Sequence, residues 1–185
     1  MSAPEIHSLP SASSGSVGRR SADTVARIAL LASVLFSGLF AGFLIGVLVL
    51  EATLRRFPAS VYTQVRLVEL VHLNDLATVL LPAALLATAT LVLVANGRPG
   101  RTRWLALTGL GLLVMTFVIS ALVSVPINTA QQSWSVLAPP SDWASMRDRW
   151  QIAHLARTIT AVSAFTALVV AAITQRPTSL RDHRR

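Results

Sequence analysis

Residues 28–50 read IALLASVLFSGLFAGFLIGVLVL, a stretch of 23 residues without a charged side chain. As an α-helix this stretch is about 34 Å long, enough to cross the roughly 30 Å hydrocarbon core of a bilayer. The apolar part of a cleaved signal peptide has only about 7–15 residues. Residues 28–50 therefore predict a retained transmembrane helix.

Three more apolar stretches follow, and the composition agrees with them. Hydrophobic residues make up 53% of the 185-residue chain, charged residues 13%, and the mean hydropathy is +0.61. A soluble domain carries about 25% charged residues. We therefore predict an all-α fold, a four-transmembrane-helix antiparallel bundle in a membrane domain of residues 25–175. The predicted spans are 28–50, 76–95, 104–125 and 153–173.

The segments outside the spans are polar. Residues 1–24 are rich in Ser, Pro, Gly and Ala and predict a disordered cytoplasmic tail, and residues 176–185 predict a basic cytoplasmic tail. Residues 51–75 predict a first outer loop that contains a short interfacial helix over 61–73. Residues 126–150 predict a second outer loop, in which a helix begins near Trp143 and continues into the fourth span.

The arginines predict the orientation of the bundle. All 16 basic residues are Arg; ten lie in the tails and around the 96–103 connection, and six lie on the side of the two outer loops. Arginine excess marks the cytoplasmic side, so we predict a multi-pass protein of the cell membrane with both termini in the cytoplasm. No basic stripe with interleaved aromatic residues lies outside the spans. The net charge of +8 therefore predicts the lipid bilayer as partner, and no nucleic acid.

Gly38, Gly42 and Gly46 recur at a spacing of four in the first span. This spacing places them on one helix face, where small residues allow a neighbouring backbone to approach closely. The pattern predicts helix packing, and a homo-oligomer through these three glycines is one form that the packing can take.

The fourth helix carries the most informative polar residues. Trp150, His154 and Arg157 are four and three residues apart, so they share one face. An arginine at the membrane edge is unfavourable unless it finds a partner or reaches water. Glu51, at the end of the first span, is the partner that we predict for Arg157. A structural ion pair that closes the bundle is the alternative to a functional site.

Metal binding is a weaker hypothesis. His72 and His154 together with Glu51 would offer two imidazoles and a carboxylate, a set that suits iron, copper or zinc. The three residues come from separate segments, no local ligand spacing supports them, and the chain has no Cys. We therefore predict no metal site.

The second outer loop and the fourth helix contain a series of short motifs: Pro126-Ile127-Asn128, Trp134, Pro140-x-Asp142-Trp143, Arg147-x-Arg149-Trp150 and His154-x-x-Arg157-Thr158. This series resembles the anthrone oxygenase family, and the resemblance extends over about residues 28–173. Characterised members oxidise anthrones to anthraquinones with molecular oxygen and need no evident cofactor. The resemblance therefore implies a lipophilic aromatic or quinone-type substrate and no cofactor.

The resemblance also suggests roles for particular residues. His154 would remove a benzylic proton as a base, while Arg157 and Asn128 would stabilise the oxyanion that forms. Trp134, Trp143 and Trp150 would line a flat aromatic pocket. Arg149, Glu51 and His72 complete the expected substrate-binding set.

Two other functions compete with an oxygenase. The chain is alternatively a non-catalytic membrane subunit or accessory protein whose outer polar cluster is structural. A small transporter is disfavoured because the midplane of the spans carries no charged or strongly polar residue. A cavity lined by His154, Arg157 and Asn128 favours an enzyme, whereas the same side chains fully paired without a cavity favour a structural cluster.

Overall fold

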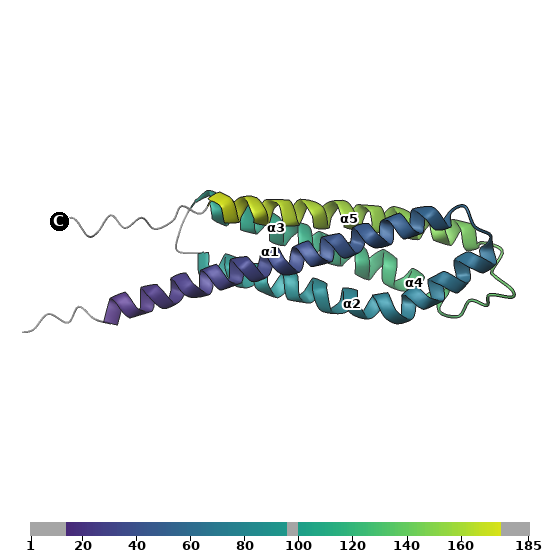
Figure 1. Cartoon of the computed structure of the whole chain (residues 1–185), viewed down its shortest axis with the longest axis horizontal. Coiled ribbons are helices and arrows are strands. Elements are labelled where there is room, and N and C mark those ends of the chain that lie inside the picture. Colours follow the sequence, from purple (N-terminus) through teal and green to yellow (C-terminus); the bar gives the residue numbers. More distant parts are fainter. Residues whose placement is uncertain (1–13, 96–99, 175–185) are drawn as a thin grey trace, which may run out of the picture.

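The structure is a computed structural model that describes residues 14–95 and 100–174, with side chains from residue 21 onward. Every regular element within these residues is helical. The longest elements are the helices α1 (Ser14–Leu54), α2 (Ala59–Val94), α3 (Arg101–Ile119) and α5 (Trp143–Thr174), which lie side by side (Figure 1). A π-helical turn, Ser120–Ser124, and the short helix α4 (Val125–Gln131) prolong α3.

Within the described residues, four helical stretches are long and apolar enough to cross a membrane: Ser21–Leu54, Ala59–Val94, Arg101–Gln131 and Trp143–Thr174. Three of the predicted spans lie wholly within these stretches, and the span 76–95 extends one residue beyond Val94. Large apolar side chains cover the outside of the bundle; Leu86, Leu93 and Ile173, for example, are at least 70% exposed. A surface of this kind suits lipid rather than water. For the described residues, the prediction of an all-helical protein with four helices long and apolar enough to span a membrane is therefore confirmed.

The interior follows the helical period. Along α1 most buried positions are three or four residues apart: Leu30, Ser33, Ser37, Phe40, Leu44, Val47, Glu51 and Leu54, with Ala29 and Ala41 buried beside them. The hydroxyl groups of Ser33 and Ser37 donate to the carbonyl oxygens four residues earlier, so neither is left unpaired. Phe40, Leu44, Leu113 and residues of α2 and α5 form the main apolar core.

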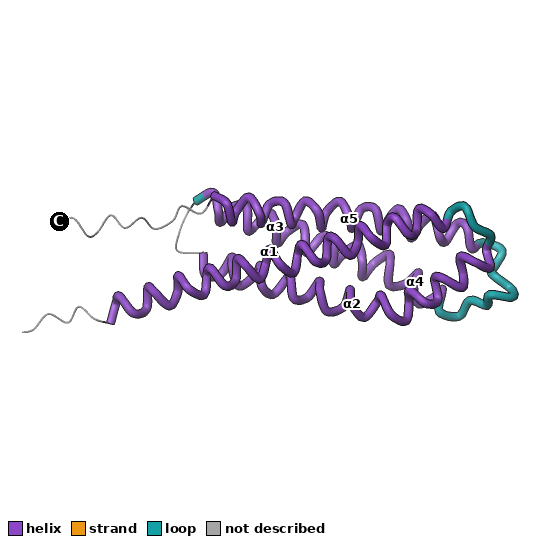
Figure 2. Tube along the Cα trace, in the orientation of Figure 1, coloured by secondary structure: helices purple, strands orange, loops and turns teal. Residues whose placement is uncertain are grey.

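The prediction of a first outer loop over 51–75 with a separate interfacial helix is wrong. The connection between α1 and α2 is only residues 55–58, and residues 59–94 form one continuous helix (Figure 2). Pro58 precedes the first turn of α2, and neither proline nor glycine occurs between Pro58 and Pro82 to interrupt it. The polar residues Asn74 and Asp75 lie on the exposed side of this helix instead of forming a turn.

The second outer loop is also shorter than the predicted 126–150. Residues 126–131 are helical, so the irregular segment covers only residues 132–142. Pro126 lacks an N–H and its ring would clash with the preceding turn of a regular α-helix. The π-helical turn before it widens the helix, with the Val125 N–H bonded to the Ser120 carbonyl oxygen five residues back. α5 begins at Trp143 as predicted and runs without a break into the fourth span.

The predicted tails lie mostly outside the described residues. Residues 1–13, 96–99 and 175–185 are not described, and α1 already begins at Ser14, so residues 14–24 of the predicted disordered tail belong to this helix. No proline occurs between Pro10 and Pro58 to end it earlier.

The three glycines of α1, at residues 38, 42 and 46, lie in two different environments. A Cβ added at Gly38 would lie 2.9 Å from Cε2 of Phe165, so this glycine allows α1 and α5 to pack closely. A Cβ at Gly42 or Gly46 would meet nothing within 4 Å, and both residues are exposed. Contact with a second copy through Gly42 and Gly46 stays a prediction.

Candidate functional site

Polar side chains gather where the end of α1, the first half of α2, α4 and the first half of α5 meet. We call this region the α4 end of the bundle, shown on the right in Figure 1. Its buried polar residues are Glu51, Thr63, Arg66, Glu69, Ser124, Gln131, Gln151, His154 and Arg157. A buried polar group is costly unless it is hydrogen-bonded, so the partners of each side chain indicate its role.

Arg66 of α2 is the centre of this cluster and is only 3% exposed. Its Nη1 donates to Glu69 Oε2 at 2.7 Å and to Glu51 Oε1 at 3.4 Å. Its Nε donates to Gln131 Oε1 at 2.8 Å, and its Nη2 donates to Asn128 Oδ1 at 2.7 Å. The Arg66 guanidinium therefore connects α1, α2 and α4, and it forms ion pairs with two carboxylates.

The predicted ion pair between Glu51 and Arg157 is wrong. Glu51 accepts from Arg66 and, through Oε2, from Gln151 Nε2 at 2.8 Å. Arg55 in turn donates to Gln151 Oε1 at 2.6 Å. Arg66 occupies the place expected for Arg157 because α2 is helical from residue 59 and presents this side chain to the end of α1.

Trp150 connects this ion cluster to His154. The guanidinium carbon of Arg66 lies 3.8 Å from the centroid of the Trp150 ring, a cation–π contact. The Trp150 and His154 rings stack with centroids 4.8 Å apart and an interplanar angle of 7°. The indole Nε1 donates to Asn128 Oδ1 at 2.7 Å. The orientation of Trp150, and through it that of His154, is thus set by Arg66 and Asn128.

The same bonds settle the orientation of the Asn128 amide. Arg66 and Trp150 both approach Asn128 with N–H groups, which can only donate, so the atom between them must be the amide oxygen. The amide NH₂ group of Asn128 therefore points away from both and is left to donate elsewhere.

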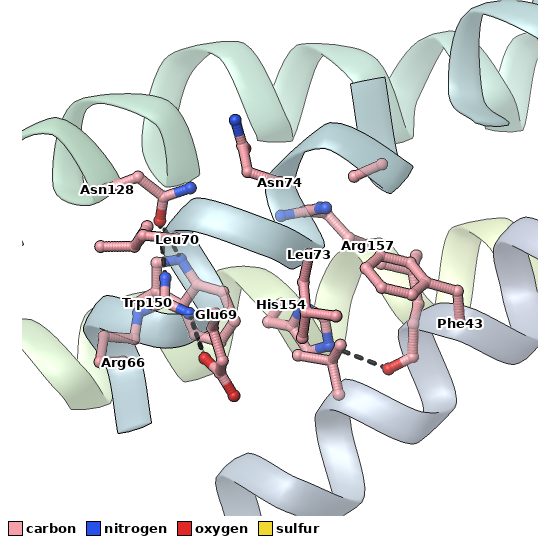
Figure 3. Close-up of a pocket in the computed structure, with 13 residues that line it drawn as sticks. Phe43, Arg66, Glu69, Leu70, Leu73, Asn74, Asn128, Trp150, His154 and Arg157 are labelled. Atoms are coloured by element: carbon pink, nitrogen blue, oxygen red, sulfur yellow. Dashed lines mark hydrogen bonds and ion pairs between the residues drawn. The ribbon is translucent and has the colours of Figure 1, made fainter. Parts of the chain in front are cut away.

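The hydrogen bond of His154 identifies its tautomer. Nε2 lies 3.0 Å from the backbone oxygen of Leu44, which can only accept, so Nε2 carries the proton (Figure 3). The other ring nitrogen, Nδ1, is buried and has no hydrogen-bond partner among the described residues. A neutral His154 therefore keeps one unshared lone pair, which is what a general base requires.

Arg157 differs from Arg66 in having no counter-ion. It is 8% exposed, its Nη1 donates to Ser124 Oγ at 3.0 Å, and its buried Nε has no partner. Among the described residues Arg157 forms no ion pair. Ser124 belongs to the π-helical turn, so the widened helix before Pro126 holds this arginine in place.

These residues surround a small cavity, drawn in Figure 3. Arg66, Glu69, Asn74, Asn128, Trp150, His154 and Arg157 form its polar and aromatic wall, and Phe43, Leu44, Val47, Leu70, Leu73 and Ala77 form its apolar wall. Its volume is about 50 Å³. A site for a drug-sized molecule has roughly 300–1,000 Å³. The cavity as it stands holds a few water-sized molecules, and a larger ligand requires its walls to move apart.

The structure brings only part of the predicted site together. His154, Arg157, Asn128 and Trp150 line the cavity, and Glu51 lies next to it through Arg66. Trp134 and Trp143 instead pack against Tyr62, with ring centroids 6.4 and 5.6 Å apart. The predicted pocket of three tryptophans is therefore not formed.

The remaining predicted residues lie apart from the cavity. His72 and Arg149 are exposed, and neither lines the cavity. Glu51, His72 and His154 do not converge, and no group of three or more His, Cys, Asp or Glu side chains in the described part of the chain is placed to hold a metal ion.

Sequence reasoning missed Arg66, Glu69 and Gln131. Tyr62, Arg66 and Glu69 are four and three residues apart, the spacing that also identifies the face of α5, and all three lie within the predicted interfacial helix 61–73. Because that helix is predicted to lie at the membrane interface, outside the bundle, its spacing is not interpreted as an arginine and a glutamate on one inward face.

Comparison with known proteins identifies the family of the chain. A model of the anthrone oxygenase family matches residues 71–167, just over half of the chain, from the first half of α2 to the second half of α5. Searches of curated proteins and of solved structures found no match. The matched region contains Asn128, Trp150, His154 and Arg157, whereas Glu51, Arg66 and Glu69 precede it. The chain belongs to the anthrone oxygenase family.

Proposed function

We propose that this protein is a membrane enzyme that oxidises a lipophilic aromatic or quinone-type compound with molecular oxygen in the cavity at the α4 end. One observation carries the proposal. The cavity brings His154, with a free ring nitrogen, together with Arg157 and the free NH₂ group of Asn128, beside a wall of apolar side chains. These side chains come from α4 and α5 and lie within the part of the chain that matches the family.

The groups suit removal of a proton next to a carbonyl. In a substrate of the anthrone kind, a CH₂ group is acidified by a carbonyl that is conjugated with it. Nδ1 of His154 accepts the proton, and the negative charge on the carbonyl oxygen is stabilised by Arg157 and by the Asn128 amide. The carbanion then reacts with O₂. Overall, CH₂ and O₂ become C=O and H₂O, so one oxygen atom enters the substrate and the other leaves as water.

Entry of the substrate requires the cavity to open. Asn74 is exposed and Leu73 is half-buried, so the edge of the cavity lies close to the surface of α2. α4 is a seven-residue helix attached through the π-helical turn, and its contacts with α2 include the bonds from Arg66 to Asn128 and Gln131. A flat apolar substrate can reach this edge from the bilayer itself.

We further propose the orientation of the bundle in the cell membrane. A helix needs about 20 residues to cross the hydrocarbon core. Counting about 20 residues back from Thr174 of α5 places the outer boundary of the core near Leu155, next to the cavity. The arginine excess in the tails and the 96–103 connection puts both termini in the cytoplasm, with the four helices antiparallel and the α4 end outside.

The alternative of a non-catalytic structural protein has one observation in its favour. Arg66 donates hydrogen bonds to Glu51, Glu69, Asn128 and Gln131 and so joins three helices. Arg66 and Glu69 also border the cavity, and Glu69 Oε1 and Gln131 Nε2 have no hydrogen-bond partner among the described residues. We assign this network to structure and the neighbouring group of Arg157, His154 and Asn128 to chemistry. The two assignments make different predictions for oxygen uptake.

Oxygen consumption by the purified protein tests the function. With anthrone as probe, the wild type is expected to consume oxygen faster than protein-free buffer, in which anthrone oxidises slowly by itself. His154→Ala is expected to reduce the protein-dependent rate about 100-fold or more. Arg149→Ala, an exposed residue on the same helix, is the matched control and should keep the full rate.

Asn128→Asp tests the donor role of the amide NH₂ group separately from the structural role of the amide oxygen. The carboxylate still accepts from Arg66 and Trp150, so folding should be preserved, but the NH₂ donor is replaced by a negative oxygen. We expect oxygen uptake to fall at least about 10-fold with little change in the melting temperature. Full activity of His154→Ala, or no protein-dependent uptake in the wild type, would contradict the proposed function.

A further inference from the structure

We infer that the cavity binds its aromatic ligand as an anion, a phenolate or enolate, with Arg157 as the counter-ion and His154 as the group that takes up the ligand's proton. The inference uses the site of the proposed function and extends it to the charge of the bound ligand. It concerns binding and does not depend on reaction with oxygen.

The first argument is the local pairing of the buried charges, which leaves one cation without a partner. Four formally charged side chains are buried at the α4 end, and Arg66 is the cation that pairs with both Glu51 and Glu69. Arg157 has no carboxylate partner among the described residues and only a serine hydroxyl as hydrogen-bond acceptor. A buried cation without a counter-ion is unfavourable, because it has lost its hydration without an opposite charge in return. A bound anion supplies the missing partner.

The second argument is the supply of hydrogen-bond donors. Arg157 has Nη1 on Ser124 and an unpaired Nε, so the guanidinium has donors left for a ligand oxygen. Asn128 presents its NH₂ group because its oxygen is held by Arg66 and Trp150. Two independent donors from α4 and α5 therefore border the same cavity. Donors of this kind bind an oxyanion more strongly than a neutral hydroxyl.

The third argument explains why the anion should be aromatic. The other walls are formed by Phe43, Leu44, Val47 and the stacked rings of Trp150 and His154. A small inorganic anion would exchange its full hydration shell for the two donors alone, because these apolar walls offer it no further hydrogen bond. A planar aromatic oxyanion spreads its charge over the ring and keeps an apolar body for the apolar wall.

Proton transfer to His154 keeps the loaded cavity neutral. The charged groups that face the cavity are Arg66 and Glu69 from α2 and Arg157 from α5, with Glu51 of α1 behind Arg66. Together these four groups have no net charge. A ligand anion would add one negative charge. If the ligand O–H or C–H proton moves to Nδ1 of His154, the imidazolium adds one positive charge, and the sum is again zero.

The test uses a ligand that resembles an oxidation product, so that no reaction occurs. A hydroxyanthraquinone absorbs at longer wavelength when its hydroxyl group is ionised, and its methyl ether cannot ionise. In titrations of the purified wild type, the bound hydroxyanthraquinone is expected to show the spectrum of the anion about 1–3 pH units below the pH at which the free compound ionises. The methyl ether should bind at least about 10-fold more weakly, since it cannot supply the counter-ion.

Variants assign the effect to Arg157. Arg157→Gln should bind the hydroxyanthraquinone weakly and with the spectrum of the neutral form, whereas Arg157→Lys keeps a positive charge and should retain the spectrum of the anion. Arg149→Gln is the matched control, since Arg149 is exposed and should behave as the wild type. The wild-type spectrum and the comparison of the two ligands need no variant, so the inference can be tested even if a change at Arg157 impairs folding.

The outcomes separate this inference from the proposed function. A neutral spectrum of the bound ligand, equal binding of the methyl ether, or no binding of either compound would overturn the inference. Anionic binding without protein-dependent oxygen uptake would support the inference and contradict the oxygenase function. Oxygen uptake together with a neutral bound ligand would do the reverse.

Discussion

Arg66 is expected to be the residue on which the stability of the α4 end depends most. Its guanidinium is 3% exposed and bonds to Glu69, Glu51, Gln131 and Asn128. Replacing it with methionine preserves much of the volume but leaves two buried carboxylates without a cation. Removing one partner of a buried ion pair costs about 3–5 kcal/mol. A loss of 3 kcal/mol lowers the ratio of folded to unfolded protein by more than about 100-fold.

The effect can be separated into its charge and packing parts. The triple variant Arg66→Met, Glu51→Gln, Glu69→Gln removes the uncompensated charge and should regain more than half of the lost free energy of unfolding. Arg66→Lys keeps the charge but has one ammonium instead of a planar fork, so it should lie between the wild type and Arg66→Met.

Unfolding by a denaturing detergent measures these differences. Tryptophan fluorescence is a direct probe, because the Arg66 guanidinium lies 3.8 Å from the centre of the Trp150 ring. Arg149→Met, on the exposed side of α5, should change the free energy of unfolding by less than about 0.5 kcal/mol. If Arg66→Met loses less than about 1 kcal/mol, or if the triple variant is no more stable than the single one, the account of a charge-balanced centre is wrong.

Two further predictions concern packing and topology. Gly38→Leu should destabilise the bundle by about 1–3 kcal/mol, because a side chain there meets the ring of Phe165, whereas Gly42→Leu has open space and should leave the protomer within about 0.5 kcal/mol. If Gly42→Leu also lowers the molecular mass measured by light scattering, a homo-oligomer through this face is supported; an unchanged mass argues against it. The chain has no cysteine, so a single Leu137→Cys variant, at a residue 97% exposed, should react with a membrane-impermeant thiol reagent in intact cells, and Gly100→Cys should react only after lysis. The opposite pattern would reverse the proposed orientation.

The face of α5 shows what local sequence could predict about the site. Trp150, His154 and Arg157 were expected on one side of a helix from their spacing, and all three line the cavity. The predicted pair of Glu51 with Arg157 is wrong because two buried arginines, Arg66 and Arg157, lie at the α4 end. Sequence alone does not say which of them faces the Glu51 carboxylate. Arg66 is 15 residues from Glu51 and 65 residues from Gln131, so its bonds depend on how helices pack rather than on spacing within one helix.

The contacts of the tryptophans also could not be predicted from their positions in the sequence. Trp134, Trp143 and Trp150 are close in sequence and were expected to form one pocket. Trp134 and Trp143 pack against Tyr62, while Trp150 packs against Arg66 and His154. The continuous α2 is the reason, because it brings both Tyr62 and Arg66 inward on one face and so provides two separate surfaces for the tryptophans.

The sequence by itself determined four helices long and apolar enough to cross a membrane, since a long apolar stretch without charge can satisfy its backbone polar groups in lipid only by hydrogen bonds within its own helix. It also determined, through helical spacing and a family resemblance, that α5 carries candidate site residues. Only the tertiary structure decided that Arg66 takes both carboxylates, that the Asn128 amide is held by Arg66 and Trp150, and that Arg157 is left without a counter-ion. The energy of a buried charge depends mainly on its nearest partner, because little water is present to screen it. The packing of helices that are distant in sequence decides which partner is nearest.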